Sequence, residues 1–237
     1  MRSEKEFVEK TLGELDVGFW CTNESLEAIV QGMDVQQGDR ILGVMGSGQQ
    51  GLAMIEKGAK VDLIDKNDIQ TEYFYKISLF IKNETNSNES CIKLLKDVSD
   101  VRDEKLMNFF DLRKIVEIRK NFEKMNILKS GDIFDLKDDL KKYNKIYLSN
   151  AIHFSPGIYS NEKFLNFVNR FNEKTLFYIS DSHANKSELE NIGFKINSYL
   201  TRKARKIDSG WDPQVIIKDN TRINLFKKIL KHVRLNV

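Results

Sequence analysis

The chain has 237 residues, of which 41% are hydrophobic, and its 38 Lys and Arg nearly balance its 35 Asp and Glu to give a formal net charge of +3. This composition predicts one globular domain over 1–237 and excludes a disordered chain, a collagen and a disulfide-stapled miniprotein. The weak net charge disfavours a dedicated nucleic-acid-binding protein. No run of 18 apolar residues and no signal-peptide pattern is present, so we expect a cytoplasmic protein without a transmembrane segment.

Hydrophobic periodicity defines the expected elements, because only two prolines punctuate the chain. In the first half we expect helices at 3–15 and 24–33, a strand at 40–45, a helix at 49–57, a strand at 60–65, a helix at 69–82, a polar loop at 83–90 without a packing signal, and two or three helices within 91–124. In the second half we expect strands at 126–128, 145–149 and 175–179, helices at 136–142, 161–171 and 186–191, edge strands at 194–201 and 214–218 joined by a polar loop, and a basic helix at 222–233.

The order of these elements predicts the fold class. A strand, a short helix and a strand within 40–65 form a βαβ unit, whose strands are parallel and whose crossover is right-handed. The further alternation predicts a Rossmann-like, open and mostly parallel α/β sheet with helices on both faces. The last two strands are expected to form an antiparallel edge pair. We also expect a helical lid at residues 1–38 and a helical insertion after the second strand, at residues 83–124.

A glycine-rich turn follows the first expected strand. Gly46-Ser47-Gly48-Gln49-Gln50-Gly51 has the GxGxxG pattern and opens a helix, and Asp65 ends the next strand nineteen residues after Gly46. Glycines let the backbone turn tightly near a ligand, a helix N-terminus presents free N–H groups, and a carboxylate at a strand end accepts the hydroxyls of a ribose. The segment therefore predicts a site for an adenosine-containing ligand, in preference to a turn that only packs a helix on the sheet.

Two cofactors fit this segment. Met45 through Asn67 resembles the nucleotide-binding start of the hydroxyacyl-CoA dehydrogenases, so an NAD-dependent dehydrogenase stays open as an alternative. The leading helical residues and the entry Gly38-Asp39-Arg40-Ile41-Leu42 resemble the class I methyltransferases, as do Ile179-Ser180-Asp181 and the 189–194 segment before two edge strands. This resemblance, over roughly residues 25–220, implies S-adenosylmethionine as the cofactor and a methyltransferase that acts on a small molecule or a lipid.

The same resemblance assigns two further loops. Ser130-Gly131-Asp132-Ile133-Phe134 is similar to the family's loop after strand three, where an acidic side chain meets the adenine amino group. Ser149-Asn150-Ala151-Ile152-His153 takes the place of the loop after strand four, beside the reacting centre. The expected cofactor-binding residues are therefore Gly46, Ser47, Gly48, Gln49, Asp65, Asn67, Asp132, Ile133 and Asn150.

The glycine motif departs from the methyltransferase pattern at one position. Class I methyltransferases typically carry Asp or Glu two residues before the first glycine, placed to hold the amino-acid part of the cofactor, whereas this chain has Val44. In this respect it is more similar to the 3-amino-3-carboxypropyl transferases, namely the nicotianamine synthases and the betaine-lipid synthases. Asp65, Asn67 and Gln70 match the second of these families, and Phe19-Trp20-Cys21-Thr22-Asn23-Glu24 sits where that family has an aromatic-acidic segment. Aminocarboxypropyl transfer is therefore the alternative to methyl transfer.

Two candidate catalytic residues follow the fourth expected strand. His153 lies just past a carboxyl end of the sheet, where a histidine of ordinary pKa near 6.5 suits a general base, and Tyr159 could orient an acceptor. Surface or packing roles are the plain alternative for both. Phe19 and Trp20 are candidates to stack over the cofactor, with core packing as their alternative.

Two further segments, the insertion at 83–124 and the basic helix at 222–233, have candidate functional roles. Because excess chain after the second strand starts on the ligand side of the sheet, 83–124 is placed to cover the acceptor pocket, where Phe109 and Phe110 would either line it or pack the added helices on the sheet. The helix at 222–233 is expected to pack on the sheet with its lysines solvated, while peripheral membrane contact is the second interpretation. A non-catalytic cofactor-binding module is the alternative from another class, and no ligand set for a metal stands out.

Overall fold

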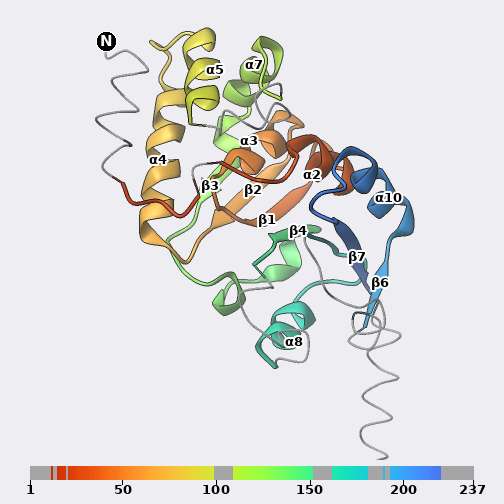
Figure 1. Ribbon diagram of the computed structural model, residues 1–237. Coiled ribbons are helices and arrows are strands. Elements are labelled where there is room, and N and C mark those ends of the chain that lie inside the picture. The colour runs from red at the N-terminus through yellow and green to blue at the C-terminus, as the bar shows by residue number, and fades with distance from the viewer. Residues whose placement is uncertain are drawn as a thin grey trace, which may run out of the picture.

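A seven-stranded sheet forms the centre of the computed structural model, which describes residues 12, 15–19, 21–98, 109–151, 162–180, 189 and 193–219 (Figure 1). Its order is β3-β2-β1-β4-β5-β7-β6, and only β7 runs antiparallel to its neighbours. The strands are β1 (Arg40–Val44), β2 (Lys60–Ile64), β3 (Met125–Ile127), β4 (Lys145–Ser149), β5 (Leu176–Ile179), β6 (Phe194–Ile196) and β7 (Gln214–Lys218). The predicted Rossmann-like, mostly parallel sheet and its antiparallel β6–β7 pair are confirmed.

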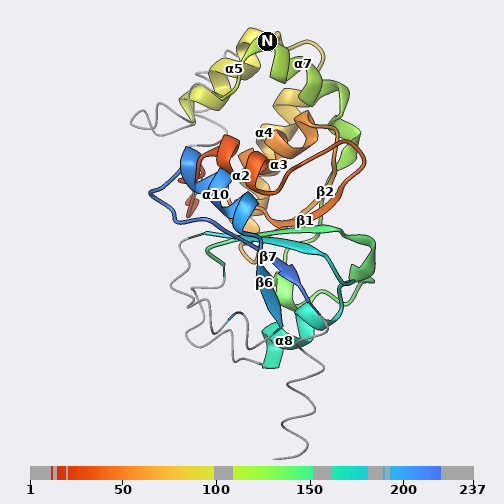
Figure 2. The ribbon, with the colours of Figure 1, turned by 90° about the vertical axis from the view of Figure 1, so that its right-hand side faces the viewer.

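Helices cover both faces of this sheet (Figures 1 and 2). The helices are α2 (Leu26–Gly32), α3 (Gln49–Glu56), α4 (Asp68–Lys82), α5 (Asn88–Asp97), α7 (Leu112–Lys120), α8 (Glu162–Asn169) and α10 (Ser198–Ile207), with short 3-10 turns η2 (Phe122–Lys124), η3 (Ile133–Asp135) and η4 (Leu140–Lys142). Side chains of α2, α3, α4, α5, α7 and α10 join one buried cluster, and those of α8 join a second. Neighbouring strand residues such as Ile41 and Leu42 belong to different clusters, because successive side chains of a strand point to opposite faces.

The first βαβ unit sets the position of the functional edge. β1 pairs with β2 in parallel register from Arg40–Lys60 to Val44–Ile64, and Gly43 pairs with Tyr147 of β4. The carboxyl ends of these three central strands therefore meet at one edge of the sheet. Loops that leave this edge are the ones that bind ligands in open α/β sheets.

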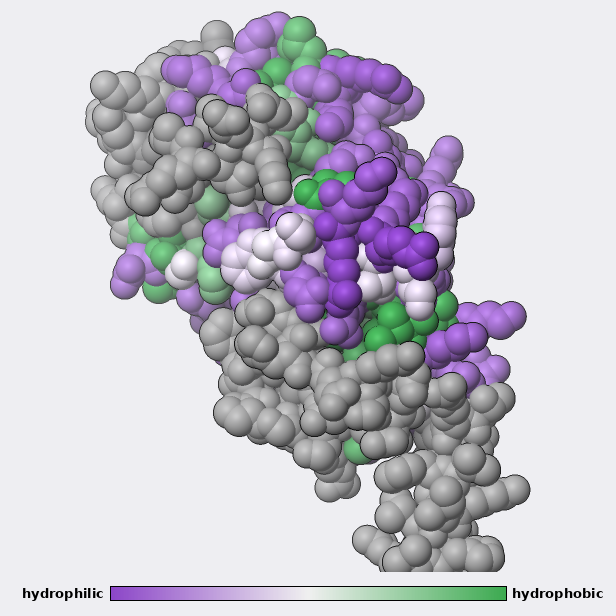
Figure 3. Space-filling model, turned by 45° about the vertical axis from the view of Figure 1, so that its right-hand side comes forward, coloured by the Kyte–Doolittle hydropathy of each residue, from purple (hydrophilic) through white to green (hydrophobic). Residues whose placement is uncertain are grey.

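The structure corrects the expected strand over 194–201 and the loop after it. β6 ends at Ile196, and Asn197 caps α10 by accepting a hydrogen bond from the N–H of Leu200. The Cβ of Ala204 lies 2.9 Å from where a Cβ on Gly32 would be, so α10 packs closely on α2. Its outer face carries exposed Arg202 and Lys206, and hydrophilic residues predominate on the described part of the face in Figure 3. Burial of one face of this helix against α2 therefore outweighs the strand propensity of its residues.

The 83–90 segment, expected to lack packing, is tied to the fold. The Arg119 guanidinium donates to the backbone oxygens of Asn83 and Asn86 and to the side-chain oxygen of Asn88, and α5 begins within the segment. The expected helix at 136–142 is also wrong, because Asp132 and Asp139 cap only the single turns η3 and η4.

Three expected helices, at 3–15, 186–191 and 222–233, fall largely or wholly outside the described residues. Among the helices that are described, none is long and apolar enough to cross a bilayer.

Candidate functional site

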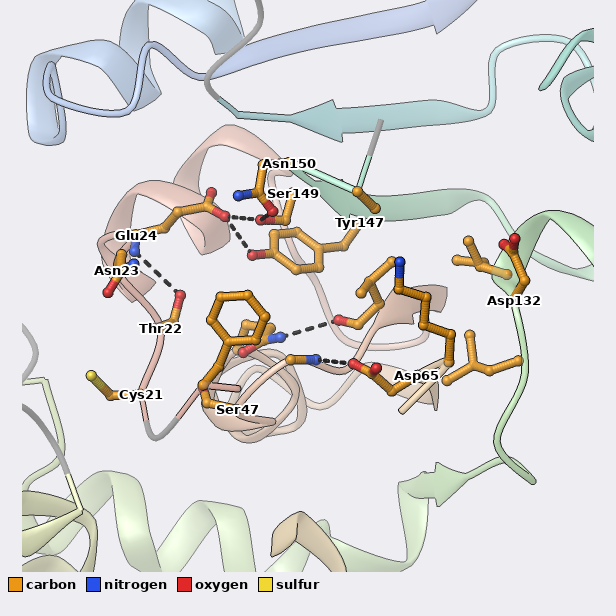
Figure 4. A pocket seen from close by; sticks show the side chains of 18 of the residues that line it. Cys21, Thr22, Asn23, Glu24, Ser47, Asp65, Asp132, Tyr147, Ser149 and Asn150 are labelled. Carbon is orange, nitrogen blue, oxygen red and sulfur yellow. Dashed lines mark hydrogen bonds between the residues drawn. The ribbon is translucent and has the colours of Figure 1, made fainter. Parts of the chain in front are cut away.

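A pocket of about 160 Å³ opens at the carboxyl edge of the central strands. Its wall combines the 19–24 segment before α2, the turn after β1, the end of β2, the 131–134 loop, the end of β4, and Trp211 before β7. Figure 4 shows Asp132 and Asp65 toward one end and Glu24, Ser149 and Asn150 toward the other. The pocket is therefore elongated, with different side chains at its two ends.

The glycine turn forms part of the pocket wall, but its glycines have different roles. Gly46 adopts φ +46° and lines the pocket, and a Cβ there would meet only Gln50 Nε2, at 3.6 Å. Gly48 adopts φ +80°, and a Cβ there would lie 2.0 Å from the ring of Phe74. A Cβ on Gly51 would lie 2.5 Å from Leu63. Gly48 and Gly51 are thus required for packing, and Gly46 is the glycine that faces the open space.

Asp65 lies at the end of β2 and is anchored by the backbone. Its Oδ2 accepts a hydrogen bond from the N–H of Gly46 at 2.9 Å, and its Oδ1 accepts one from the N–H of Asn67 at 3.0 Å. Burial raises the pKa of the Asp65 carboxyl, although these N–H groups and Lys66 act to lower it. Each oxygen of a carboxylate has two acceptor positions, so Asp65 retains capacity toward a ligand in the pocket.

The loop after β3 forms the wall at the Asp132 end. The N–H of Gly131 donates to the backbone oxygen of Asp65 at 2.8 Å, which fixes the loop to the end of β2. Ile133 is 4% exposed and lines the pocket together with Ile64. Asp132 also lines the pocket, but its Oδ1 accepts from the N–H of Phe134 and its Oδ2 pairs with Lys163 at 2.9 Å. This end combines apolar surface with a carboxylate that is already partnered.

The opposite end contains a buried carboxyl group that the expected cofactor-binding set omits. Glu24 is 4% exposed, and its Oε1 accepts hydrogen bonds from Tyr147 OH at 2.8 Å and from Ser149 Oγ. Its Oε2 is buried and has no hydrogen-bond partner among the described residues. Burial, and secondarily the charge of Asp208, raise the pKa of Glu24, while the hydroxyl donors act to lower it.

The 19–24 segment is held in place by side chains from elsewhere in the chain. Gln70 binds the backbone of Phe19 twice, through Oε1 at 3.0 Å and Nε2 at 2.7 Å, and Gln49 Oε1 accepts from the N–H of Thr22 at 3.1 Å. The N–H of Ser25 donates to Asp208 at 2.7 Å across 183 positions of sequence. Glu24 is therefore placed by contacts with α3, α4 and the end of α10.

The structure brings together six of the nine expected cofactor-binding residues along the pocket wall: Gly46, Ser47, Asp65, Asp132, Ile133 and Asn150. Three do not line it: Gly48 packs on Phe74, Gln49 holds Thr22, and Asn67 caps α4 by accepting from the N–H groups of Ile69 and Gln70. His153, Tyr159 and Trp20 lie outside the described residues, and Phe19 lines the pocket at 44% exposure.

The lining residues that the expected cofactor-binding and catalytic sets omit include Glu24, Gln50, Tyr147, Ser149 and Trp211. The aromatic-acidic segment that ends in Glu24 was the available signal for the first. Tyr147 was assigned only to a strand, and Ser149 was placed at the loop beside the reacting centre without a role of its own; alternation places both on one face of the strand.

The expected lid role of the insertion is not supported. Phe109 and Phe110 are 4% and 3% exposed, belong to the larger buried cluster, and contact each other edge to face at 5.1 Å between ring centroids. No residue of 83–98 or 109–124 lines the pocket. α7 packs against α3 and α5, so the described part of the insertion extends the core on that face.

Comparisons with known proteins find likeness only among solved structures. Models of protein families give no match, and neither do curated proteins. The chain is similar to the YcgJ protein from Bacillus subtilis (12% identity, 82% of this chain and 98% of that chain, TM-score 0.49). It is also similar to a TehB-like S-adenosylmethionine-dependent methyltransferase from Corynebacterium glutamicum (13%, 84% and 88%, TM-score 0.48) and to a precorrin-6y C5,15-methyltransferase from Geobacter metallireducens (10%, 78% and 79%, TM-score 0.45). For three other matched structures, the chain spans less than half of their length, from 34% to 48%. These likenesses concern the fold.

Proposed function

We propose that this protein is an S-adenosylmethionine-dependent transferase, with methyl transfer to a small-molecule or lipid acceptor as the first candidate reaction. The observation that carries the proposal is the charge of the pocket. Glu24, Asp65 and Asp132 line it, and Lys66 is the only basic side chain among the described lining residues, while Lys163 pairs with Asp132 from outside the lining. A pocket with this balance favours a cationic adenosine derivative, because the charges of ligand and wall are then complementary.

The residues present fit such a cofactor. Asp65 would accept the ribose hydroxyls, and Ile64 and Ile133 would contact the adenine ring. Two buried oxygens, Glu24 Oε2 and Gln50 Oε1, have no hydrogen-bond partner in the described part of the chain. Buried acceptors of this kind are normally satisfied, so donor groups of a bound ligand are a natural partner for them.

The same geometry disfavours the dinucleotide alternative. In dinucleotide-binding folds the second glycine lets the backbone approach the pyrophosphate, whereas here the ring of Phe74 fills the space beside Gly48. Thr22 is bound to Gln49, the first residue of α3, so the 19–24 segment lies against the start of the helix. A pyrophosphate would also add two negative charges to a pocket that already contains three carboxyl groups.

S-adenosylmethionine supplies an electrophilic carbon next to a sulfonium, whose leaving group is a neutral thioether. The protein's part is then to align an acceptor in line with the carbon–sulfur bond and to remove a proton where the acceptor is an amine or a hydroxyl. Asn150 lines the pocket and would orient the acceptor (Figure 4), because the hydroxyls of the neighbouring Tyr147 and Ser149 already donate to Glu24. His153 and Tyr159, which follow Asn150 in the sequence, are the candidate base and orienting residue.

Calorimetry tests the cofactor assignment. S-adenosylhomocysteine should bind at micromolar concentration, and NADH at least tenfold more weakly, a difference of about 1.4 kcal/mol. Equal or tighter binding of NADH would overturn the proposal and favour the dehydrogenase alternative.

Aminocarboxypropyl transfer is the second candidate reaction. The observation that favours it is Val44, where a methyltransferase-like pattern has an acid, together with the buried Glu24 that lines the same pocket. Incubation with labelled S-adenosylmethionine and a mixture of candidate acceptors, followed by chromatography, separates the reactions. S-adenosylhomocysteine as product means methyl transfer, methylthioadenosine means aminocarboxypropyl transfer, and neither product alongside cofactor binding favours a binding module.

A further inference from the structure

We propose that Glu24 binds the ammonium group of the cofactor's amino-acid moiety and so takes the role of the acid that the chain lacks at position 44. This inference rests on the proposed function and deepens it. It assigns the end of the pocket farthest from Asp132 as the ammonium subsite (Figure 4).

The geometry of Glu24 leaves one oxygen for a ligand. Tyr147 OH and Ser149 Oγ both donate to Oε1, and Ser180 Oγ lies 3.4 Å from Ser149 Oγ. Oε2 is buried without a hydrogen bond of regular geometry among the described residues, although the Ser180 hydroxyl also acts on this carboxyl group, and Glu24 lines the pocket. An ammonium group has three donors and no acceptor, which matches an acceptor-only oxygen.

Among the described residues, no cation compensates the charge of Glu24. In the described part of the chain no Lys, Arg or His forms an ion pair with it, and the neighbouring groups are hydroxyls from β4, the hydroxyl of Ser180, and the carboxylate of Asp208 at the end of α10. Lys66 acts on Asp65, at the other end of the pocket. A buried carboxylate is costly unless it is paired, so a cationic ligand would relieve the cost.

The position of Val44 explains why another residue would take the role. Val44 packs against the α8-side cluster, whereas Tyr147 belongs to the cluster on the opposite face of the sheet. Glu24 reaches the pocket from the Tyr147 side. Its segment is bound to Gln49, the first residue after the glycine turn, and this contact ties Glu24 to the cofactor-binding turn.

Four affinities measured by calorimetry test the proposal. The probes are S-adenosylhomocysteine and its deaminated analogue, in which hydrogen replaces the amino group. Wild-type protein should bind S-adenosylhomocysteine at least tenfold more tightly than the analogue. Glu24→Gln keeps the shape and the Oε1 acceptor but removes the charge, so it should reduce that preference to threefold or less while binding the analogue about as well as wild type does.

Glu27→Gln is the matched control. Glu27 lies on α2, outside the pocket, where it accepts from Gln31, so its substitution should leave the tenfold preference intact. If Glu24→Gln lacks a cooperative melt, Glu24→Asp replaces it. This variant keeps the charge but withdraws the carboxylate by one methylene, and it should give an intermediate preference.

Three results would overturn the proposal. A wild-type protein that binds both probes equally has no ammonium subsite. An unchanged preference in a folded Glu24 variant assigns the ammonium to another group. Equal weakening of both probes would make Glu24 a structural residue. These results leave the proposed function standing, whereas a wild-type protein that binds neither probe overturns the proposed function and this inference together.

Discussion

The two ends of the pocket are built over very different distances in sequence. At one end, Asp65 binds the N–H of Gly46, nineteen positions earlier, within a single βαβ unit. At the other, Glu24 binds Tyr147 across 123 positions, and the adjacent Ser25 binds Asp208 across 183. The first end is a local motif that a sequence pattern can reveal, and the second exists only when three distant segments have packed together.

The two carboxyl groups are also stabilised differently. Asp65 receives two backbone N–H donors, whereas Glu24 receives only side-chain hydroxyls, and burial raises the pKa of both. Backbone donors are retained whenever the turn forms, but the Glu24 environment depends on side chains of β4. The comparison therefore predicts that the two ends respond differently to substitution, and that core residues without contact to either end leave both unchanged.

The largest effect is expected from the insertion. Phe109→Ala removes a buried ring from the core and should lower the free energy of unfolding by about 3–5 kcal/mol. Because Phe109 does not line the pocket, the affinity for S-adenosylhomocysteine should be unchanged at temperatures where the variant is folded. Denaturant unfolding and calorimetry measure the two quantities, with Tyr199→Ala, at 72% exposure, as the control. Loss of affinity without loss of stability would restore the lid interpretation.

The next largest effect is expected at the two glycines of the turn, whose substitution by alanine should cost different amounts of stability. Gly48→Ala places a Cβ 2.0 Å from Phe74 at φ +80° and should cost about 2–4 kcal/mol of stability. Gly46→Ala meets nothing closer than 3.6 Å, so only its φ of +46° is unfavourable, at about 1 kcal/mol. Thermal melts of both variants test this order. A Gly46 variant that is less stable than the Gly48 variant would contradict the assigned roles.

Asp65→Ala should weaken cofactor binding by about 1.5–3 kcal/mol, because a charge-assisted hydrogen bond to the ribose is lost. The structure adds a second consequence. Asp65 also accepts from the N–H groups of Gly46 and Asn67, so the variant should melt at a lower temperature than wild type. Asp65→Asn keeps one acceptor oxygen, so its cofactor affinity and its melting temperature should lie between those of wild type and of Asp65→Ala. Unchanged affinity in a folded variant would remove Asp65 as the ribose ligand.

The smallest effect is expected at the other end. The raised pKa of Glu24 means that the folded protein binds a proton there more strongly than the unfolded chain does, so this stabilisation is present below the ordinary value of 4.5 and is lost as pH rises through the folded-state pKa. Glu24→Gln lacks the charge, so without ligand it should be more stable than wild type at neutral pH, by about 1 kcal/mol.

Melts across pH check this sign. The stability difference between Glu24→Gln and wild type should shrink as pH falls through the raised folded-state pKa of Glu24 toward 4.5, and it should change no further below 4.5, where both side chains are neutral in both states. A wild-type protein that is more stable than the variant at neutral pH would show that the ionised carboxylate already has a compensating partner.

Most of the strands and the glycine turn follow from the sequence because their determinants are short-range. β1, β2, β4 and β7 are buried runs bounded by turn residues, and Asp65 falls at a strand end by simple counting. The segment over 198–207 was misread because its β-branched and aromatic residues also suit a strand. Burial of Leu200 and Ala204 on the α2 side of the sheet, which is not a local property, makes it α10.

By itself, the amino-acid sequence determined the parallel α/β sheet, the turn at Gly46 and the carboxylate at Asp65, because period and spacing are properties of neighbouring residues. Only the tertiary structure decided that Gly48 accommodates Phe74, that Phe109 belongs to the core, and that Glu24 faces the pocket. Each of these depends on which distant side chain occupies a given volume. Close packing of the interior settles that question, and no periodicity in the chain encodes it.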